Sequence, residues 1–588
     1  MHEPAQRLAL GRARGEAFFW KLAGGDEVHA IWEKWRPAGA DLTLFFTAAE
    51  VPREDPKVYH RTFARDDEVR RREVANPYSL MRLAANPYML FMLTQVYLVS
   101  GELPSNRAAL FGQFVDVLLV REGLAEGMPG SPLRYTAEGE ALLSGLGALA
   151  WMIQSRRERR RVEKDDGQTT DTLTVFPRSP AERLLAGLKR AASGSSLLTV
   201  DGREVRFSHQ LLQEYFTALG MQKRLEAGQA DAAAWWPSDR WWAPSGWEEV
   251  AVLLAGLYAD DCSPVLFWLA DTQPEVAARC IERSGASVPE STLQVLGTRW
   301  FPRLRDPSPA ARAAIGRALG GVRMRGSLLD VRAGVGLRNG LPDIDWVEVR
   351  GSVFQYGDKR TKVSLDTFQI ARYPVTNIQF KAFIDDPEGY ANDCWWEGLA
   401  KRSEQSEPPR WNFANHPRET ASWYEAMAFC RWLDARLRGR GDLTGGWQVR
   451  IPTEQEWEKA ARGTDGREYP WGKFESGHAN INETYEHAGP NYLRQTSAVG
   501  IYPGGASPYR ALDMAGNVWE WCLNKYDKPA DTSTGGDDKQ VLRGGSWGFD
   551  RGSCRAPAAT GTVPTTVTTT SAFGFVGVSP SAETLITE

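Results

Sequence analysis

Residues 499–521 read VGIYPGGASPYRALDMAGNVWEW and place two carboxylates on either side of a glycine. A tight turn at Gly516 would bring the Asp513 and Glu520 carboxylates to one point. The backbone carbonyls of Gly516 and Val518 would converge there too. Oxygen-only ligand sets of this kind suit a hard cation such as Ca²⁺. The simpler interpretation is a loop held by side-chain hydrogen bonds to its own backbone, but the pattern favours calcium.

The chain around this segment is typical of an α+β domain over residues 326–588. Short runs such as residues 345–357, DWVEVRGSVFQYG, alternate apolar and polar residues and indicate strands. Capping boxes predict the starts of three helices, because a hydroxyl and a carboxylate or amide satisfy the first helix N–H groups. The boxes pair Thr376 with Gln379, Ser422 with Glu425 and Thr453 with Glu456.

The rest of the chain is predicted to be α-helical, so the protein is expected to be multidomain. Residues 1–230 carry apolar residues at helical spacing, most clearly over residues 86–124. A short hairpin turning at residues 201–202 leads into a helix from about Ser208, an order that predicts a winged-helix element. Residues 231–325 contain short amphipathic helices of irregular period and are predicted to be a helical linker or repeat-like segment.

The composition excludes several classes of protein. The 588 residues include 42% hydrophobic and 24% charged residues, and the formal net charge is −4. Neither value indicates a nucleic-acid or membrane partner. The apolar runs are shorter than the roughly 20 residues that span a bilayer. Six scattered cysteines without paired spacing indicate reduced thiols, and we therefore expect a cytoplasmic protein.

Eight segments of the C-terminal half carry a family resemblance by their order and spacing. They read YPVTNIQFKAF, ASWYEAMAFCRWL, VRIPTEQEWEKAARG, YPWG, ANINE, VGIYPGGASPYRALDMAGNVWEW, VLRGGSW and FGF. Together they resemble the formylglycine-generating-enzyme-type sulfatase-modifying domain, a version of the C-type lectin fold, over roughly residues 343–578. The resemblance implies that the loop at residues 513–520 binds calcium. It also implies a second calcium site at Asn480 and Ile481, for which an ordinary structural loop is an equal alternative.

The N-terminal half resembles the C-terminal part of a NACHT-type signalling ATPase of the STAND group. Residues 86–97, NPYMLFMLTQVY, look like its helical domain, and residues 207–218, FSHQLLQEYFTA, look like its winged helix. The resemblance places His209 where that family contacts a nucleotide phosphate. However, no GxxxxGK[ST] motif occurs, and a phosphate cradle needs one. We expect no ATP binding and a capping or core role for His209, unless a P-loop segment precedes this chain.

Cysteine chemistry decides between an enzyme and a binding protein. The resembled enzymes use a redox-active cysteine pair just after the GGS segment to bind copper and activate oxygen. This chain has Cys554 there and no near partner, and a lone thiol is more often structural. His416, His478 and His487 show no metal-ligand spacing. We therefore expect no catalysis, and the alternative is a formylglycine-generating oxidoreductase.

The segment after GGSW has an unusual composition. Residues 548–578 contain no Lys, Glu, Gln, Met or Trp, and seven of the eleven residues 560–570 are threonine. Where the family would have asparagine, this chain has Gly, Phe, Asp, Ser, Ala, Thr or Val. Each of these is reached from an AAC or AAT codon by changing its adenines. The resulting codons end in a pyrimidine and never specify the five absent residues.

That signature resembles the variable region of a diversity-generating retroelement target protein, over about residues 547–578. Frame residues survive between the altered ones, whereas a plain threonine-rich strand, the alternative, would not need them. We expect a ligand-binding surface for a protein or other macromolecular ligand, carried by a scaffold in which Trp547 and Phe575 are core aromatics. The expected variable positions are Gly548, Phe549, Asp550, Gly552, Ser553, Ala558, Thr560, Thr562, Val563, Thr565, Thr566, Thr568, Thr569 and Thr570.

Overall fold

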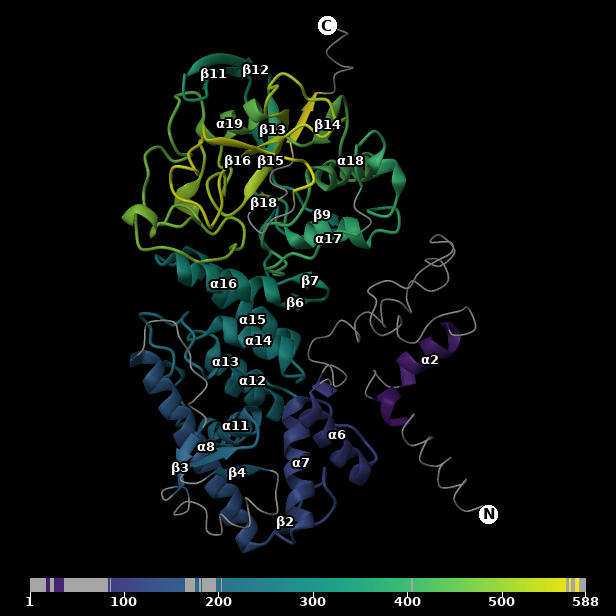
Figure 1. The fold of residues 1–588 in the computed structure, drawn as a ribbon, viewed down its shortest axis with the longest axis vertical. Coiled ribbons are helices and arrows are strands. Elements are labelled where there is room, and N and C mark those ends of the chain that lie inside the picture. The colour runs from purple at the N-terminus through teal and green to yellow at the C-terminus, as the bar shows by residue number, and fades with distance from the viewer. Residues whose placement is uncertain are drawn as a thin grey trace. The chain divides into compact units, whose positions relative to one another are not determined.

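The computed structural model divides into two compact units, Met1–Pro289 and Glu290–Glu588, which are described separately (Figure 1). The predicted three-part division at residues 230 and 325 stays a prediction. The structure describes residues 17–21, 26–35, 83–84, 86–163, 175–178, 181, 197–201, 204–402, 405–566, 571–572 and 577–580.

The N-terminal unit is mostly helical, as the sequence predicts. Its helices are α2 (Asp26–Trp35), α6 (Pro87–Ser100), α7 (Arg107–Arg121), α8 (Ala137–Glu163), α11 (Gln210–Glu226), η3 (Ala232–Ala234), α12 (Glu248–Leu257), α13 (Ser263–Leu269) and α14 (Pro274–Arg283). Its strands are β1 (Ala125–Glu126), β2 (Arg134–Tyr135), β3 (Val175–Pro177), β4 (Leu198–Asp201) and β5 (Glu204–Phe207). The order β3-β5-β4 forms one antiparallel sheet, and β1 pairs with β2.

Local sequence signals explain where α6 and α7 begin and end. The Asn86 side chain accepts a hydrogen bond from the Tyr88 N–H at 2.9 Å, and Pro87 occupies the first helical position. Gly101 ends α6 in the left-handed region at φ 72°, which glycine adopts without a Cβ penalty. Asn106 caps α7 through the Ala109 N–H at 2.9 Å.

The predicted hairpin and helix at residues 198–226 are present as β4, β5 and α11. β4 pairs with β5 in antiparallel register, while the turn itself lies outside the described residues. His209 is the N-cap of α11, where its Nδ1 accepts from the Leu211 N–H at 3.1 Å. Its ring stacks on Tyr88 with 5.4 Å between the centroids. His209 therefore has the capping role expected from the sequence, and the winged-helix interpretation stays a prediction.

The C-terminal unit is an α+β structure. Its helices are α15 (Glu290–Trp300), η4 (Phe301–Arg305), α16 (Pro309–Gly321), α17 (Asn377–Asp385), η5 (Asp393–Trp396), α18 (Trp423–Arg440), α19 (Glu454–Arg462), η6 (Tyr485–His487) and η7 (Pro503–Gly505). Its strands are β6 (Arg323–Met324), β7 (Ser327–Leu328), β8 (Leu337–Arg338), β9 (Leu341–Pro342), β10 (Trp346–Val349), β11 (Ser352–Tyr356), β12 (Thr361–Leu365), β13 (Phe368–Ala371), β14 (Trp447–Arg450), β15 (Trp519–Lys525), β16 (Gln540–Arg543), β17 (Ala559–Thr562), β18 (Ser571–Ala572) and β19 (Gly577–Pro580).

Two four-stranded sheets organise this unit. In the first, β19 lies between β13 and β14, so the last described strand completes a sheet begun more than 200 residues earlier. In the second, the order is β17-β16-β15-β18, and β17 lies at the edge, where β16 is its partner among the described strands. β11 and β12 form a separate hairpin, and two further hairpins join β6 to β7 and β8 to β9.

The three predicted capping boxes are all present, at the starts of α17, α18 and α19. α18 is buried along most of its length and lies in the larger hydrophobic core of the unit. Two tryptophans tie this core together through their ring nitrogens. The Trp423 indole donates to the Cys522 carbonyl at 3.0 Å, and the Trp521 indole donates to the Ala421 carbonyl at 3.0 Å.

A buried ionic network links α19 to β16. Arg543 approaches Glu454 at 2.6 Å and Glu458 at 2.9 Å. Glu458 also accepts from Arg462 at 2.7 Å. All four side chains are buried and have lost their hydration, so each charge is stabilised by its ion-pair partners instead. β16 is therefore held from both sides, by its sheet neighbours and by α19.

Among the described helices of the whole chain, none is long and apolar enough to cross a bilayer.

Candidate ligand surface and cation loop

The described variable positions lie on β17 and on the loops before and after it. None of these eleven positions is buried. Phe549 and Val563 are 41% and 46% exposed. Thr568, Thr569 and Thr570 lie outside the described residues, as does Phe575. The described variable positions are Gly548, Phe549, Asp550, Gly552, Ser553, Ala558, Thr560, Thr562, Val563, Thr565 and Thr566.

Two of the frame residues between these positions, Cys554 and Pro564, are buried, whereas Arg551 is exposed and Arg555 is half-buried. Cys554 has 0% exposure and packs with Ala479, Ile481 and Ala515. Pro564 is buried, and its carbonyl accepts from the Trp423 N–H at 3.0 Å. The buried residues Cys554 and Pro564 hold the backbone of the segment in place, and the variable positions around them are half-buried or exposed.

Two glycines, Gly545 just before the segment and Gly561 within it, have no room for a side chain. A Cβ on Gly545 would lie 2.2 Å from the Cys554 sulfur, and a Cβ on Gly561 would lie 2.3 Å from the Tyr526 ring. A Cβ on Gly552 would meet nothing closer than 3.4 Å, at an Asp550 oxygen. Gly552 is one of the variable positions, and Gly561 is not, although it lies between two of them.

The described cysteines give no support to thiol chemistry. All six are free, so no disulfide is formed. Complete burial holds the pKa of the Cys554 thiol far above its ordinary value, which leaves it protonated at neutral pH. Cys554 is thus a packing residue of the frame and not an activated nucleophile.

Trp547 differs from its expected core role, because it is only half-buried. Its ring packs edge-on against Trp411 at 5.1 Å and stacks on Tyr492 at 6.3 Å. Arg410 lies 4.9 Å from the Trp411 ring, and Arg494 lies 5.5 Å from the Tyr492 ring. We call these five residues the aromatic–arginine cluster. Its members come from three distant segments, and no local sequence pattern indicates that they meet.

Glu419 lies beneath this cluster with its carboxylate buried. The carboxylate accepts a hydrogen bond from the Trp411 N–H at 2.8 Å. Burial raises the pKa of Glu419 to about 7, and its backbone hydrogen bonds and neighbouring arginines offset only part of this effect. Glu419 therefore changes charge near neutral pH directly under the cluster.

The predicted cation loop has a strained backbone. Asp513, Gly516 and Asn517 have φ values of 65°, 80° and 65°. Non-glycine residues rarely adopt this region, and strain of this kind is retained where the surrounding structure requires it. A Cβ on Gly516 would lie 2.4 Å from the Asn480 carbonyl oxygen, so the two predicted calcium segments are in direct contact.

The predicted cation ligands have separate partners around this turn. The Asp513 carboxylate is fully buried, accepts from the Gly500 N–H at 2.6 Å, and has its pKa raised to about 6 by burial. The Glu520 carboxylate accepts from the Trp457 indole at 2.6 Å. The buried Asn480 side-chain oxygen accepts no hydrogen bond from the described residues. The Asn480 oxygen alone therefore fits a cation by its lack of a hydrogen bond, because a positive charge would offset its lost hydration.

Side chains of the usual metal-binding types do not gather in threes at the cation loop or at any other place among the described residues. Across the described residues, no three His, Cys, Asp or Glu side chains are close enough to hold a metal ion together. His416 is buried, with Nδ1 2.9 Å from the Thr496 hydroxyl, and burial lowers its pKa well below the ordinary value. His478 lies 3.4 Å from Glu475. Nothing brings these histidines into one site.

Residues 340–576 match the family model of the sulfatase-modifying factor enzyme 1-like domain. The C-terminal region therefore carries a domain of this type, which confirms that part of the sequence-based expectation. The NACHT-type interpretation of the N-terminal half stays a prediction.

Several curated proteins are similar over this region. The hercynine oxygenase of Mycolicibacterium smegmatis is 32% identical over 229 residues, which are 33% of this chain and 49% of that protein. The inactive C-alpha-formylglycine-generating enzyme 2 of Mus musculus is 30% identical over 224 residues, which are 32% of this chain and 65% of that protein. This chain spans about half the length of the hercynine oxygenases that it matches.

Solved structures are also similar in part. The Treponema denticola variable protein 1 covers 39% of this chain and 94% of its own, with 21% identity and a TM-score of 0.30. The protein CarF covers 40% of this chain and 98% of its own, with 22% identity and a TM-score of 0.29.

Proposed function

We propose that this protein is a non-enzymatic binding protein that presents a sequence-diversified surface on a sulfatase-modifying-factor-type scaffold. The observation that carries the proposal is the division of burial over residues 547–566. None of the described variable positions is buried, whereas two of the five described frame residues, Cys554 and Pro564, are; Trp547, Arg551 and Arg555 are half-buried or exposed. A surface whose side chains can change without disturbing the scaffold is what a diversified binding site requires.

The aromatic–arginine cluster supplies what the variable residues lack. Small residues and threonine rarely dominate binding energy, while Trp, Tyr and Arg do. Trp547 directly precedes the variable positions and contacts Trp411 and Tyr492. We propose that the ligand is a protein or other macromolecule that covers both surfaces. The cluster would then provide constant affinity, and the variable positions would provide specificity.

A binding selection tests this proposal. A library carrying pyrimidine-ending random codons at the eleven described variable positions would be displayed and panned against lysozyme as an unrelated test protein. We expect binders whose affinity depends on the variable side chains and falls on Trp547→Ala. A library of equal size at exposed positions on the β11–β12 hairpin serves as the control. Equal enrichment from the two libraries would contradict the proposal.

The alternative is an oxidoreductase, and the similarity to hercynine oxygenases and formylglycine-generating enzymes favours testing it. The buried, protonated Cys554 argues against thiol-dependent oxidation. Incubation with a cysteine-containing sulfatase peptide, copper and oxygen should yield no aldehyde. Aldehyde formation that is lost in Cys554→Ser would establish the oxidoreductase instead.

We propose calcium as the structural cation of the 513–520 loop. The support is the buried Asp513 carboxylate, the strained turn and the uncompensated Asn480 oxygen. Asp513, Gly516, Val518 and Glu520 would hold this cation, which would supply positive charge to a buried acidic turn, and Asn480 and Ile481 would belong to the second predicted site. At 100 times its dissociation constant a cation stabilises the native state by about 2.7 kcal/mol. Calcium should therefore raise the melting temperature of the parent, with Asp513→Asn and magnesium as controls.

We also propose that the N-terminal unit relays ligand binding without hydrolysing ATP. The relay role is supported by the resemblance of residues 86–97 and 207–218 to a NACHT-type ATPase. The expectation of no ATP hydrolysis is supported by the lack of a GxxxxGK[ST] motif in the given sequence and by the hydrogen bond that the His209 ring accepts from the Leu211 N–H. Equilibrium dialysis with ATP and with ADP should show no binding at micromolar protein. Micromolar affinity that is lost in His209→Ala would contradict this proposal.

A further inference from the structure

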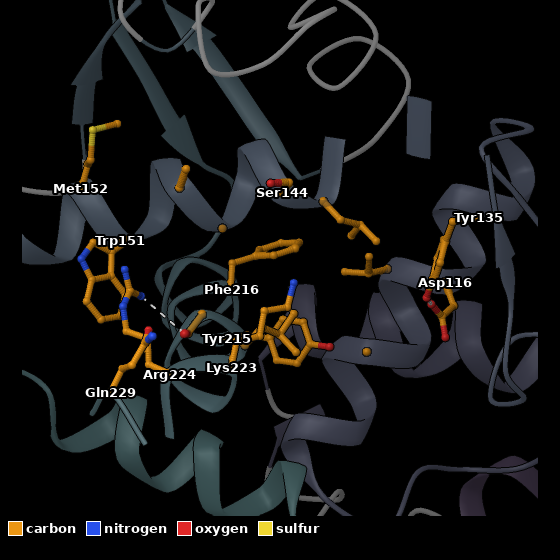
Figure 2. A pocket seen from close by; sticks show the side chains of 17 residues that line it. Asp116, Tyr135, Ser144, Trp151, Met152, Tyr215, Phe216, Lys223, Arg224 and Gln229 are labelled. Atoms are coloured by element: carbon orange, nitrogen blue, oxygen red, sulfur yellow. Dashed lines mark hydrogen bonds between the residues drawn. The ribbon is translucent and has the colours of Figure 1, made fainter. Parts of the chain in front are cut away.

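A cavity of about 740 Å³ opens within the N-terminal unit, among α7, α8 and α11 (Figure 2). One face of α11 runs along the cavity from Tyr215 to Arg224, a distance of about 14 Å at 1.5 Å per residue. α8 lines it with the same helical spacing, from Leu143 to Met152. A cavity of this size and length suits a small organic molecule and is separate from the variable surface.

Glycines line this cavity on three helices. Gly112, Gly147 and Gly220 line it from α7, α8 and α11. Glycine inside a helix is less stable than alanine, because it loses more backbone freedom on folding. A Cβ on Gly147 would meet nothing closer than 3.9 Å, so packing does not require a glycine there. Gly147 therefore lowers the stability of α8 without a packing reason, and the space that its missing side chain leaves is part of the cavity.

One end of the cavity is positively charged and aromatic. The Arg224 guanidinium lies 3.5 Å from the centre of the Trp151 ring, and one of its nitrogens donates to the Gly220 carbonyl at 3.4 Å. Trp151 itself packs edge-on against Trp247 at 5.2 Å. A stacked guanidinium keeps N–H donors at its edge for an anion. Lys223 lines the same cavity and is exposed.

The opposite end carries a hydrogen-bond acceptor. Asp116 on α7 accepts from the Tyr135 hydroxyl at 3.1 Å. Figure 2 shows this pair far from Trp151 and Arg224, with Tyr215 and Phe216 between the two ends. A carboxylate of this kind accepts hydrogen bonds from N–H or O–H donors. The cavity thus has an anion-binding end, flat aromatic walls and a donor-binding end.

We infer that this cavity binds a small organic anion with a flat aromatic body and an N–H donor at the end opposite its acid group. The acid group contacts Lys223 and Arg224, and the donor contacts Asp116. Carboxylic acids built on indole and monophosphates built on purine share this chemistry. The two probes indole-3-acetate and adenosine monophosphate distinguish these sources, and indole and adenosine are their uncharged counterparts.

Isothermal titration calorimetry of the full chain tests the inference. At least one anionic probe should bind with 1:1 stoichiometry and at least tenfold more tightly than its uncharged counterpart, because hydrogen bonds to charged groups contribute about 1.5–3 kcal/mol. The probe that binds more tightly identifies the acid group. Absence of millimolar binding by both anionic probes, or equal binding of charged and uncharged forms, would overturn the inference.

Two variant pairs locate the binding. Gly147→Leu should abolish binding by filling the cavity, whereas Gly147→Ala should keep it and slightly raise the melting temperature. Lys223→Gln should weaken the anionic probe about tenfold and leave its uncharged counterpart unchanged. Arg240→Gln, at an exposed position away from the cavity, should have no effect. If Gly147→Leu does not fold, the comparison of Lys223→Gln with Arg240→Gln decides. Equal affinities of these two variants for the anionic probe would refute the site.

Discussion

β16 and β17 are neighbours in one sheet, yet they constrain their residues in opposite ways. All four residues of β16 are buried, while all four of β17 are half-buried. β16 pairs on both sides and contributes Arg543 to an ionic network, whereas β17 is the edge strand. Burial, the number of paired strands and buried charge therefore decide which strand tolerates side-chain substitution, although the two strands are neighbours in one sheet.

Removing the buried charge of β16 should have the largest effect. Arg543→Met leaves Glu454 and Glu458 buried without their shared partner, which should cost about 3–5 kcal/mol. On β17, Thr560→Met should change stability by no more than about 0.5 kcal/mol. Urea unfolding of both variants measures the difference. Equal losses would show that β17 is as constrained as β16.

The pH dependence tests the buried acid beneath the aromatic–arginine cluster. The pKa of Glu419 is raised to about 7 in the folded state, so the folded state binds a proton that the unfolded state has already lost. Stability should therefore fall as the pH rises from about 4.5 to 7, by on the order of 2 kcal/mol. The melting temperature of Glu419→Gln should fall less steeply over this range, and the part that remains belongs to Asp513, whose pKa is raised to about 6. The same slope in both proteins would place the titration elsewhere.

The two glycines of the segment give a matched pair of variants. Gly561→Ser should destabilise the protein by about 1–3 kcal/mol, because its Cβ would lie 2.3 Å from the Tyr526 ring. Gly552→Ser should be nearly neutral, since its Cβ has room. Thermal melts of the two variants sharpen the distinction between frame and variable positions. A neutral Gly561→Ser would mean that the Tyr526 ring moves aside freely.

Local signals predicted the local structure. The three capping boxes begin α17, α18 and α19, and the β4–β5 hairpin precedes α11 as expected. These features depend on residues a few positions apart, which a sequence shows directly. The insertion of β19 between β13 and β14 depends on pairing across the whole domain, and no local pattern encodes it.

For the candidate site too, the sequence predicts the local pattern of the segment but not its long-range contacts. The codon pattern predicts which positions are variable and which are frame, and burial follows that division at Cys554 and Pro564 but not at Arg551 and Arg555. Trp547 was expected in the core because it is a large aromatic residue, yet it packs among half-exposed rings. Trp411 and Tyr492 were missed because they lie 136 and 55 residues before Trp547 in the sequence. Sequence spacing does not report contacts of that range.

The most direct measurement is the folded fraction of two libraries of this domain. One library would carry pyrimidine-ending random codons at the eleven described variable positions, and the other at eleven buried positions of α18 and β16. Resistance to protease on a display surface measures folding of each variant. The account predicts that most variants of the first library stay folded and that few of the second do. Similar folded fractions in the two libraries would contradict the claim that residues 547–566 form a surface free to diversify.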